Sequence, residues 1–295
     1  MTASKSQIFL KVDRLIPQNS LLFRALRFLY RESKETVKIL KLILASRKPF
    51  QSHPDTNVIV SLTSFPARIK YAWIPIETMF LQDTLFWKVV LVLSEEEFPD
   101  KLLPYRIRQQ EKRGLEILWT KSNIGSYKKL LPTRTSYPDA TIVTIDDDVY
   151  YSPWMLRQLI SAARNRPGTI IGFRGWAITL NNKLLPYIEW PEANPITPTD
   201  NVFLTGAGGI LYPPHLVSDN LLLNYELAKK LCPTADDIWF WAIARKAGIP
   251  LFCIGNHDIE RVRRQRKSPA LESINRERGQ NDIQLKAIIE FFDLL

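Results

Sequence analysis

The chain has 295 residues, of which 45% are hydrophobic and 24% are charged. This composition excludes a mainly disordered chain and supplies enough apolar side chains for one substantial α/β core. The two cysteines, Cys232 and Cys253, are too few for a disulfide framework or a cysteine zinc site, and we expect both to be reduced in a cytoplasmic protein.

The net charge of +10 is concentrated near the N-terminus. Residues 1–50 contain eleven Lys or Arg and three Asp or Glu, so they carry +8 and leave the rest of the chain close to neutral. An enzyme that binds nucleic acid more often carries basic side chains along its groove, so we expect no nucleic-acid partner. The sequence has no uncharged apolar run of roughly eighteen residues, so we expect no spanning helix. We also expect no secretory signal peptide.

Residues 20–48 are predicted to form one amphipathic helix with Ser20 as its N-cap. Six cations recur there every three or four residues and share one stripe, with leucines on the other side. They are Arg24, Arg27, Arg31, Lys34, Lys38 and Lys41. This pattern is typical of a helix that lies on an anionic bilayer, so we expect residues 1–55 to associate with the inner face of the cell membrane. Alternatively, the helix packs on the protein's own core or on a second copy.

A polar linker with two prolines follows, and we expect a catalytic domain at 56–295. Apolar runs alternate there with helical patterns. The predicted strands are 58–62, 89–93, 116–119 and 141–145, and the predicted helices are 71–82, 101–113 and 153–164. This alternation predicts an α/β fold with a mostly parallel sheet flanked by helices. Ligands bind such sheets beyond the carboxyl ends of the strands, so we expect functional residues in the loops there.

The second half of the chain alternates less regularly. We expect an irregular excursion at 174–202, a glycine-rich turn and strand at 203–212, a helix at 235–246, a strand at 251–254 and a final helix at 283–294. Thr234 is the candidate N-cap of the first of these helices, and Asn281 or Asp282 that of the second.

Three consecutive aspartates, Asp146, Asp147 and Asp148, follow the apolar run at 141–145. Adjacent carboxylates repel one another, so their collection in one loop favours a compensating cation. Mn²⁺ and Mg²⁺ bind carboxylate oxygens and leave room for phosphate oxygens. The pattern therefore indicates a metal and diphosphate site. The alternative is a solvated acidic turn before a helix that starts at Pro153.

A strand followed by Asp-x-Asp resembles the glycosyltransferases of the GT-A fold, and the likeness is closest to bacterial enzymes that build lipopolysaccharide or capsule. Four further segments within 57–295 share the resemblance. They are VSLTSFPARI at 60–69, NIGSYKKLLP at 123–132, FLTGAGGILYPP at 203–214 and CPTADDIWFWA at 232–242. The resemblance implies a GT-A (nucleotide-diphospho-sugar transferase, Rossmann-like) fold, a UDP-sugar donor, and Mn²⁺ or Mg²⁺ held by Asp146 and Asp148.

The loop after the first predicted strand supplies three donor-binding candidates. Thr63, Ser64 and Arg68 suit contacts to the base, ribose or phosphates, as the resemblance implies. Arg68 is alternatively an ordinary arginine at the start of a helix. Asp146 and Asp147 are further candidates for contact with the donor.

Two later segments complete the expected donor site. Tyr127 offers a flat face, and Lys128 and Lys129 offer charge to a phosphate or to the uracil ring. We expect at least one of the two lysines to be an ordinary surface residue. Gly208 and Gly209 allow close approach of the backbone to a ligand, or else form a tight structural turn.

Asp236 and Asp237 open the predicted helix at 235–246. Acidic side chains complement the positive end of a helix dipole, and this alone would account for them. The resemblance implies that one of the pair, Asp237, is the base that deprotonates the acceptor hydroxyl with inversion. Retention is the other possible outcome. His257 is the candidate third metal ligand, with Asp258 as its substitute.

Residues 261–267, RVRRQRK, form a basic segment. They are a lid that neutralises the leaving diphosphate, a patch for lipid phosphates, or a solvated loop. We expect several aromatic side chains to line the acceptor cleft, although some of them belong to the core. They are Trp176, Tyr187, Trp190, Trp239 and Trp241.

These features together predict a cytoplasmic, peripheral membrane enzyme that transfers a sugar from UDP to a hydroxyl of a glycan. The acceptor is expected to be a lipid-linked oligosaccharide at the anionic inner leaflet. A nucleotidyltransferase that releases pyrophosphate is one alternative. A non-catalytic scaffold of a polysaccharide assembly complex is the other.

Overall fold

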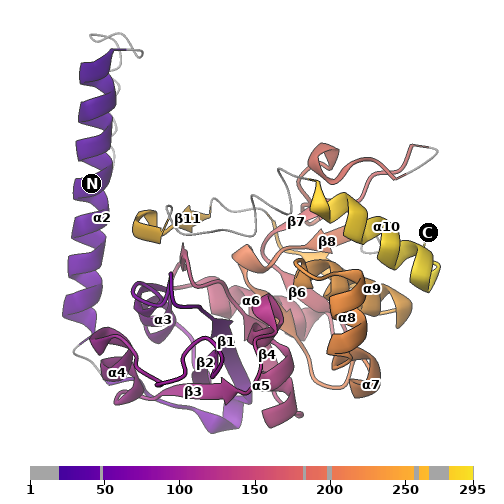
Figure 1. Ribbon diagram of the computed structural model, residues 1–295, viewed down its shortest axis with the longest axis horizontal. Coiled ribbons are helices and arrows are strands. Elements are labelled where there is room, and N and C mark those ends of the chain that lie inside the picture. Colours follow the sequence, from indigo (N-terminus) through magenta and orange to yellow (C-terminus); the bar gives the residue numbers. More distant parts are fainter. Residues whose placement is uncertain are drawn as a thin grey trace. The chain divides into compact units, whose positions relative to one another are not determined.

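The structure is a computed structural model that describes residues 20–46, 49–181, 184–197, 201–255, 259–265 and 279–294 (Figure 1). The chain divides into two compact units, Met1–Lys48 and Pro49–Leu295, which are considered separately. The roles expected of the two parts, membrane association and catalysis, stay predictions.

The first unit contains one long helix, α2 (Leu21–Ala45), as predicted. The Ser20 hydroxyl accepts a hydrogen bond from the Phe23 backbone N–H at 3.1 Å, so Ser20 is the N-cap. Among the residues that the structure describes, none of the helices combines the length and the apolar character that crossing a bilayer requires.

The second unit is built on a seven-stranded sheet. Its strands are β1 (Val58–Thr63), β2 (Lys88–Ser94), β3 (Leu115–Thr120), β4 (Thr141–Thr144), β6 (Ile170–Gly172), β9 (Ile210–Tyr212) and β10 (Leu251–Cys253). Their order is β10-β6-β9-β4-β1-β2-β3, and within this sheet only β9 is antiparallel to its neighbours. The predicted α/β class with a mostly parallel sheet is therefore confirmed.

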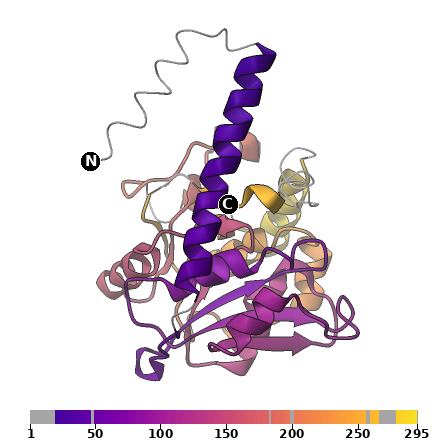
Figure 2. The same ribbon diagram turned by 90° about the vertical axis from the view of Figure 1, so that its left-hand side faces the viewer.

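Helices cover this sheet. They are α3 (Trp73–Phe80), α4 (Tyr105–Glu111), α5 (Leu131–Ser136), α6 (Met155–Asn165), α8 (Tyr225–Leu231), α9 (Asp236–Lys246) and α10 (Gln280–Phe292). α3 packs against α4 and β2, whereas α6 packs against β6 and β9. α8, α9 and α10 contact one another at the end of the unit that carries the later strands (Figure 1). Figure 2 views the unit from the opposite end, where β1, β2 and β3 run side by side.

Two segments are more ordered than predicted. Phe50, in the expected linker, stacks on Phe80 at 4.8 Å and lies 4.9 Å from Phe86, measured between ring centroids. The linker is therefore packed on the second unit from residue 50 onward. The expected irregular excursion at 174–202 is closed at its ends, where β7 (Gly175–Ala177) pairs with β8 (Val202–Leu204).

The predicted N-caps of the last helix are wrong. α10 begins after Gly279, which has a left-handed backbone with φ of 69°, so Asn281 and Asp282 already lie in its first turn. The Asp282 carboxylate instead accepts a hydrogen bond from the Tyr187 backbone N–H at 2.7 Å. This side chain is therefore used to attach α10 to a distant loop.

The N-cap prediction for α9 is wrong for a similar reason. The cap position is Ala235, and no side chain caps the helix there. The Thr234 hydroxyl accepts a hydrogen bond from the Gln284 amide of α10 at 3.0 Å. The helix at 153–164 also starts later than predicted, at Met155 rather than Pro153.

Candidate functional site

The order in which the chain adds strands to the sheet reverses between β1 and β4. β2 and β3 lie on one side of β1, whereas β4 and the later strands lie on the other. The two strands are parallel, with Ser61 opposite Thr144, and continuing this register places Ser64 opposite Asp147. The Ser64 hydroxyl donates a hydrogen bond to the Asp147 carboxylate at 2.6 Å. In open α/β sheets such a switch point forms a crevice that binds ligands.

A cavity of about 630 Å³ opens at this switch point. Its wall is formed by the loops after β1 and β4, by the 3₁₀ turn η2 (Gly125–Lys129), by the start of α9 and by the first turn of α10. The ionisable side chains on the wall are Arg68, Glu97, Lys128, Lys129, Asp146, Asp147, Asp148, Arg174, Asp236, Asp237 and Arg261. Thr63 and Ser64 line it too, so the fold brings most of the predicted site residues together.

Two arginines neutralise the second and third aspartates. Arg68 donates to Asp147 at 3.1 Å and to Asp148 at 3.2 Å. Arg261 donates to both carboxylate oxygens of Asp148, at 2.9 and 2.8 Å. Burial raises the pKa of Asp147 to about 6, although Arg68 and Ser64 oppose the rise. Arg68 therefore acts on the carboxylates themselves and is not merely a helix-start arginine.

Arg261 is placed by a short strand that crosses the site. This strand, β11 (Glu260–Arg261), pairs with β5 (Val149–Tyr150), which directly follows the aspartates. The Val262 backbone N–H donates to the Asp148 carbonyl at 2.7 Å, and the Gln265 amide donates to the Asp147 carbonyl at 3.2 Å. The first residues of the predicted basic segment thus contact the acidic loop, whereas positions 266 and 267 lie outside the described residues.

Lys129 neutralises carboxylates from two parts of the chain. Its ammonium nitrogen lies 3.3 Å from an oxygen of Asp146, 3.1 Å from one of Asp236 and 3.9 Å from one of Asp237. Burial alone would lower the pKa of Lys129, but these three carboxylates hold it well above its usual value. Lys128 is also buried and forms an ion pair with Glu97. The expectation that one of the two lysines is a surface residue is wrong.

The two carboxylate oxygens of Asp237 differ in their contacts, and the Lys129 ammonium approaches Oδ1 only to 3.9 Å. One carboxylate oxygen accepts a hydrogen bond from the Gly206 backbone N–H at 3.0 Å. The other oxygen, Oδ1, is buried and accepts no hydrogen bond from the described residues. Burial raises the pKa of Asp237 to about 7, and Lys129 opposes the rise. A carboxylate of this kind on a cavity wall can accept a proton from a bound hydroxyl.

Three predicted donor contacts lie elsewhere. Tyr127 is buried in the core, where its hydroxyl donates to the Cys232 carbonyl at 2.6 Å, and it is not on the cavity wall. A Cβ atom at Gly208 would lie 2.8 Å from the backbone nitrogen of Arg174. Gly209 has a φ of 89° and packs near Met155. Both glycines are thus required by the packing of the chain itself, which supports the structural alternative for this loop.

The carboxylates of the aspartate loop fit a divalent cation in their chemistry. Asp146 and Asp148 line the cavity and supply the hard oxygen ligands that Mn²⁺ and Mg²⁺ prefer. An ion would have to take the place of Arg261 on Asp148. In the described part of the chain, no three acidic, imidazole or thiol side chains are grouped closely enough to form a complete metal site. His257 and Asp258 lie outside that part.

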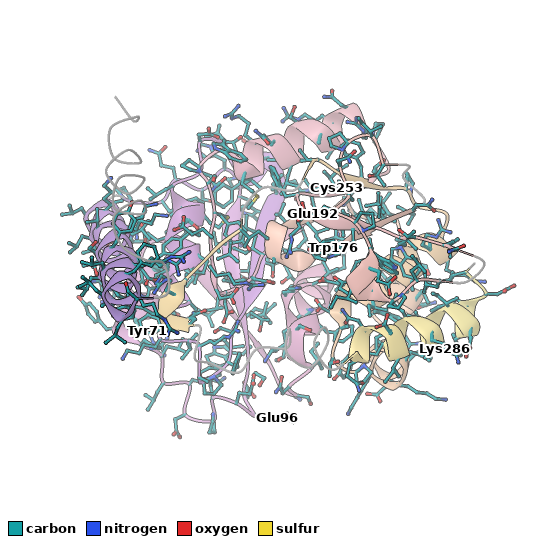
Figure 3. The ribbon with its side chains drawn as sticks, turned by 90° about the horizontal axis from the view of Figure 1, so that it is seen from above. Tyr71, Glu96, Trp176, Glu192, Cys253 and Lys286 are labelled. Atoms are coloured by element: carbon teal, nitrogen blue, oxygen red, sulfur yellow. The ribbon has the colours of Figure 1, made fainter. Side chains whose placement is uncertain are left out.

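The aromatic side chains divide between the cavity and the core. Trp176 and Tyr187 line the cavity, as predicted for an acceptor cleft. Trp190, Trp239 and Trp241 are instead buried in the hydrophobic core. Figure 3 shows Trp176 next to Glu192, with which it forms an isolated antiparallel bridge.

Several residues on the cavity wall were not predicted as site residues, among them Arg174 and Asn281. Arg174 is the second residue after β6. A cation just beyond the end of a strand was the sequence signal that could have identified it as a site residue. Asn281 comes from the first turn of α10 and was considered only as a helix cap. The sequence carries no local sign that this turn reaches the cavity.

Neither the known family models nor the curated proteins include a match to this chain. Solved structures with a similar fold include S. aureus TarS 1–349, with 14% identity, a TM-score of 0.43, and coverage of 68% of this chain and 59% of that one. A 4-diphosphocytidyl-2C-methyl-D-erythritol synthase from Anaerococcus prevotii has 12% identity and a TM-score of 0.44, and the match covers 68% of this chain and 89% of that one. A CMP-2-keto-3-deoxy-manno-octonic acid synthetase complexed with CTP has 11% identity and a TM-score of 0.41, and the match covers 68% of this chain and 89% of that one. Likeness at this level assigns no activity to this chain.

Replacing Lys129 with Met should strongly destabilise the second unit. The substitution leaves Asp146 and Asp236 partly or fully buried without their cation, and we expect the free energy of unfolding to fall by about 3 kcal/mol or more. Urea unfolding followed by tryptophan fluorescence measures the loss. As a control, Lys101→Met removes an exposed ion pair with Glu95 and should cost less than about 1 kcal/mol. Equal losses in the two variants would contradict this account of Lys129.

Proposed function

We propose that the second unit transfers a sugar from a nucleoside diphosphate, with UDP-sugars as the first candidates, to a hydroxyl of a glycan in surface polysaccharide synthesis. One observation carries the proposal. The three aspartates at 146–148 share one cavity with Arg68 and Lys129, which suit phosphate oxygens, and with Asp237, whose Oδ1 accepts no hydrogen bond from the described residues. Metal-assisted glycosyl transfer with inversion can use all of these groups, as metal ligands, phosphate-binding cations and base.

The donor is expected at the switch-point end of the cavity. Thr63 ends β1 there, Ser64 and Arg68 lie in the loop that follows, and all three would contact the nucleotide. Asp146 and Asp148 would hold Mn²⁺ or Mg²⁺, which would offset the negative charge that develops on the leaving diphosphate. With the charge of Asp147 and Asp148 balanced by such an ion, Arg68 and Arg261 would be free to contact phosphate oxygens.

The acceptor hydroxyl is expected at Asp237. Its Oδ1 atom would take the hydroxyl proton while the acceptor oxygen attacks the anomeric carbon and the bond from that carbon to the diphosphate breaks, which inverts the configuration. Asp236 is less suited to this role because Lys129 lies 3.1 Å from it. Trp176 and Tyr187 offer flat faces to the acceptor sugars.

The proposal predicts that UDP binds only together with a divalent ion. Calorimetry with Mn²⁺ present should detect UDP binding to the wild-type chain, whereas Asp148→Ala should weaken it by about ten-fold or more. Asp139→Ala is the matched control because Asp139 is exposed and lies outside the cavity. Incubation with UDP-sugars and Mn²⁺ should slowly release UDP even without an acceptor.

Two further measurements test the alternative functions. Release of pyrophosphate from nucleoside triphosphates would identify a nucleotidyltransferase. Unchanged glycan production in cells that carry Asp148→Ala would indicate a scaffold. Absence of any metal-assisted binding of a nucleotide would refute the proposed reaction.

The role of Asp237 as base predicts a pH dependence. Because its pKa is raised to about 7 and a base must be ionised, turnover of the wild-type enzyme should fall as the pH drops below about 7. Asp237→Asn should lower kcat about 100-fold or more and leave the affinity for UDP unchanged. Initial rates of UDP release with an acceptor, measured from acid to neutral pH, test both. A rate that does not change over this range would exclude Asp237 as the base.

We also propose that α2 holds the enzyme on the anionic inner face of the membrane, near a lipid-linked acceptor. Deleting residues 1–48 should then move the protein from the membrane pellet to the soluble fraction. Full-length protein should bind vesicles with anionic lipids more strongly than neutral vesicles, and replacing Lys34, Lys38 and Lys41 with Gln should weaken this binding. Retention of the shortened protein in the pellet would show that the helix is not the anchor.

A further inference from the structure

The cations on the cavity wall differ in whether they form ion pairs with carboxylates. These cations are Arg68, Lys128, Lys129, Arg174 and Arg261. Four of them form ion pairs with carboxylates, but the described residues provide none for Arg174. The Arg174 guanidinium instead lies over the Trp176 ring, 5.0 Å from its centroid. A half-buried cation to which the described residues offer no counter-charge favours the binding of an anion.

Arg174 is held in position by its backbone. Its carbonyl oxygen accepts a hydrogen bond from the Thr205 backbone N–H at 2.9 Å. Gly208 packs so closely that an added Cβ would lie 2.8 Å from the Arg174 backbone nitrogen. Trp176 is fixed as well, because it pairs with Phe203 in the β7–β8 ladder and its ring meets that of Tyr187 edge-on at 6.2 Å. The guanidinium therefore rests on a rigid support.

One short turn links Arg174 to the candidate base. The 3₁₀ turn η5 (Gly206–Gly208) begins at the glycine whose N–H donates to Asp237. It ends at the glycine that packs on Arg174. A sugar that presents a hydroxyl to Asp237 and lies against Trp176 therefore has Arg174 within the same stretch of cavity wall. The cations already paired with the aspartate loop and with Asp236 belong to the part expected to hold the donor.

We propose that Arg174, supported by Trp176, binds an anionic group on the acceptor, either the carboxylate of a uronic acid or a phosphate ester on a sugar. This inference rests on the proposed glycosyl transfer and adds a class of acceptor to it. A planar guanidinium suits this task because it stacks on an aromatic ring and still offers two parallel N–H donors to carboxylate or phosphate oxygens. A lysine provides only the charge.

The test compares matched sugars on the full-length protein. Glucose, glucuronic acid and glucose 6-phosphate are titrated with UDP and Mn²⁺ present, and again without nucleotide, and binding is followed by ligand-observed NMR. Wild-type protein should bind at least one of the two anionic sugars about ten-fold more tightly than glucose, and the better of the two identifies the anion. Arg174→Gln should abolish this preference, and Arg174→Lys should restore only part of it.

The matched control is Arg106→Gln. Arg106 lies over the Trp73 ring at 5.1 Å, nearly the same arrangement, but outside the cavity. This variant should keep the preference, and every variant should keep the wild-type affinity for UDP. Equal binding of all three sugars to the wild-type protein would overturn the inference, as would a loss of UDP binding in Arg174→Gln, which would assign Arg174 to the donor. Failure of UDP to bind the wild-type protein would refute the proposed function, whereas the titration without nucleotide still decides whether Arg174 selects anions.

Discussion

The ammonium group of Lys129 joins two halves of the second unit that would otherwise repel. Asp146 follows β4, whereas Asp236 and Asp237 begin α9, about ninety positions later in the sequence. Bringing these carboxylates onto one partly buried wall is unfavourable unless a cation lies among them. Lys129 supplies that charge from a 3₁₀ turn that packs against β1. The cavity wall depends on this arrangement.

Arginines neutralise the other carboxylates of the acidic loop, as Lys129 neutralises Asp146. Arg68 and Arg261 hold the oxygens of Asp147 and Asp148 in defined positions, with Ser64 as a further donor. These groups are therefore oriented before a ligand arrives, which reduces the cost of reorganisation on binding. If a metal ion and a diphosphate bind as proposed, Asp146 and Asp148 would hold the ion, and the arginines now paired with the aspartates would be free to contact the phosphates.

The features predictable from the sequence are those with a local signal. Buried parallel strands are continuous apolar runs, so β1, β2 and β4 could be located, and the aspartate loop followed from the end of β4. The roles of Thr234 and Asp282 could not, because their hydrogen-bond partners come from remote parts of the chain. Burial of Lys129 was likewise invisible, since two of its three carboxylate partners lie far along the chain. Arg174 was missed because the sequence does not show that the described residues around it offer no carboxylate partner, which is a property of the folded cavity.

The last described helix determines when the site is completed during synthesis. Asn281 forms part of the cavity wall, and two neighbours in α10 are bonded to loops that carry Tyr187 and Thr234. The sheet and the aspartate loop lie earlier in the chain and can fold while it is still being made. A nascent chain that has not yet produced residues 279–294 therefore lacks the part of the cavity wall that Asn281 forms, together with both of these hydrogen bonds. Premature termination within this region would yield a protein with an assembled sheet and an unfinished site.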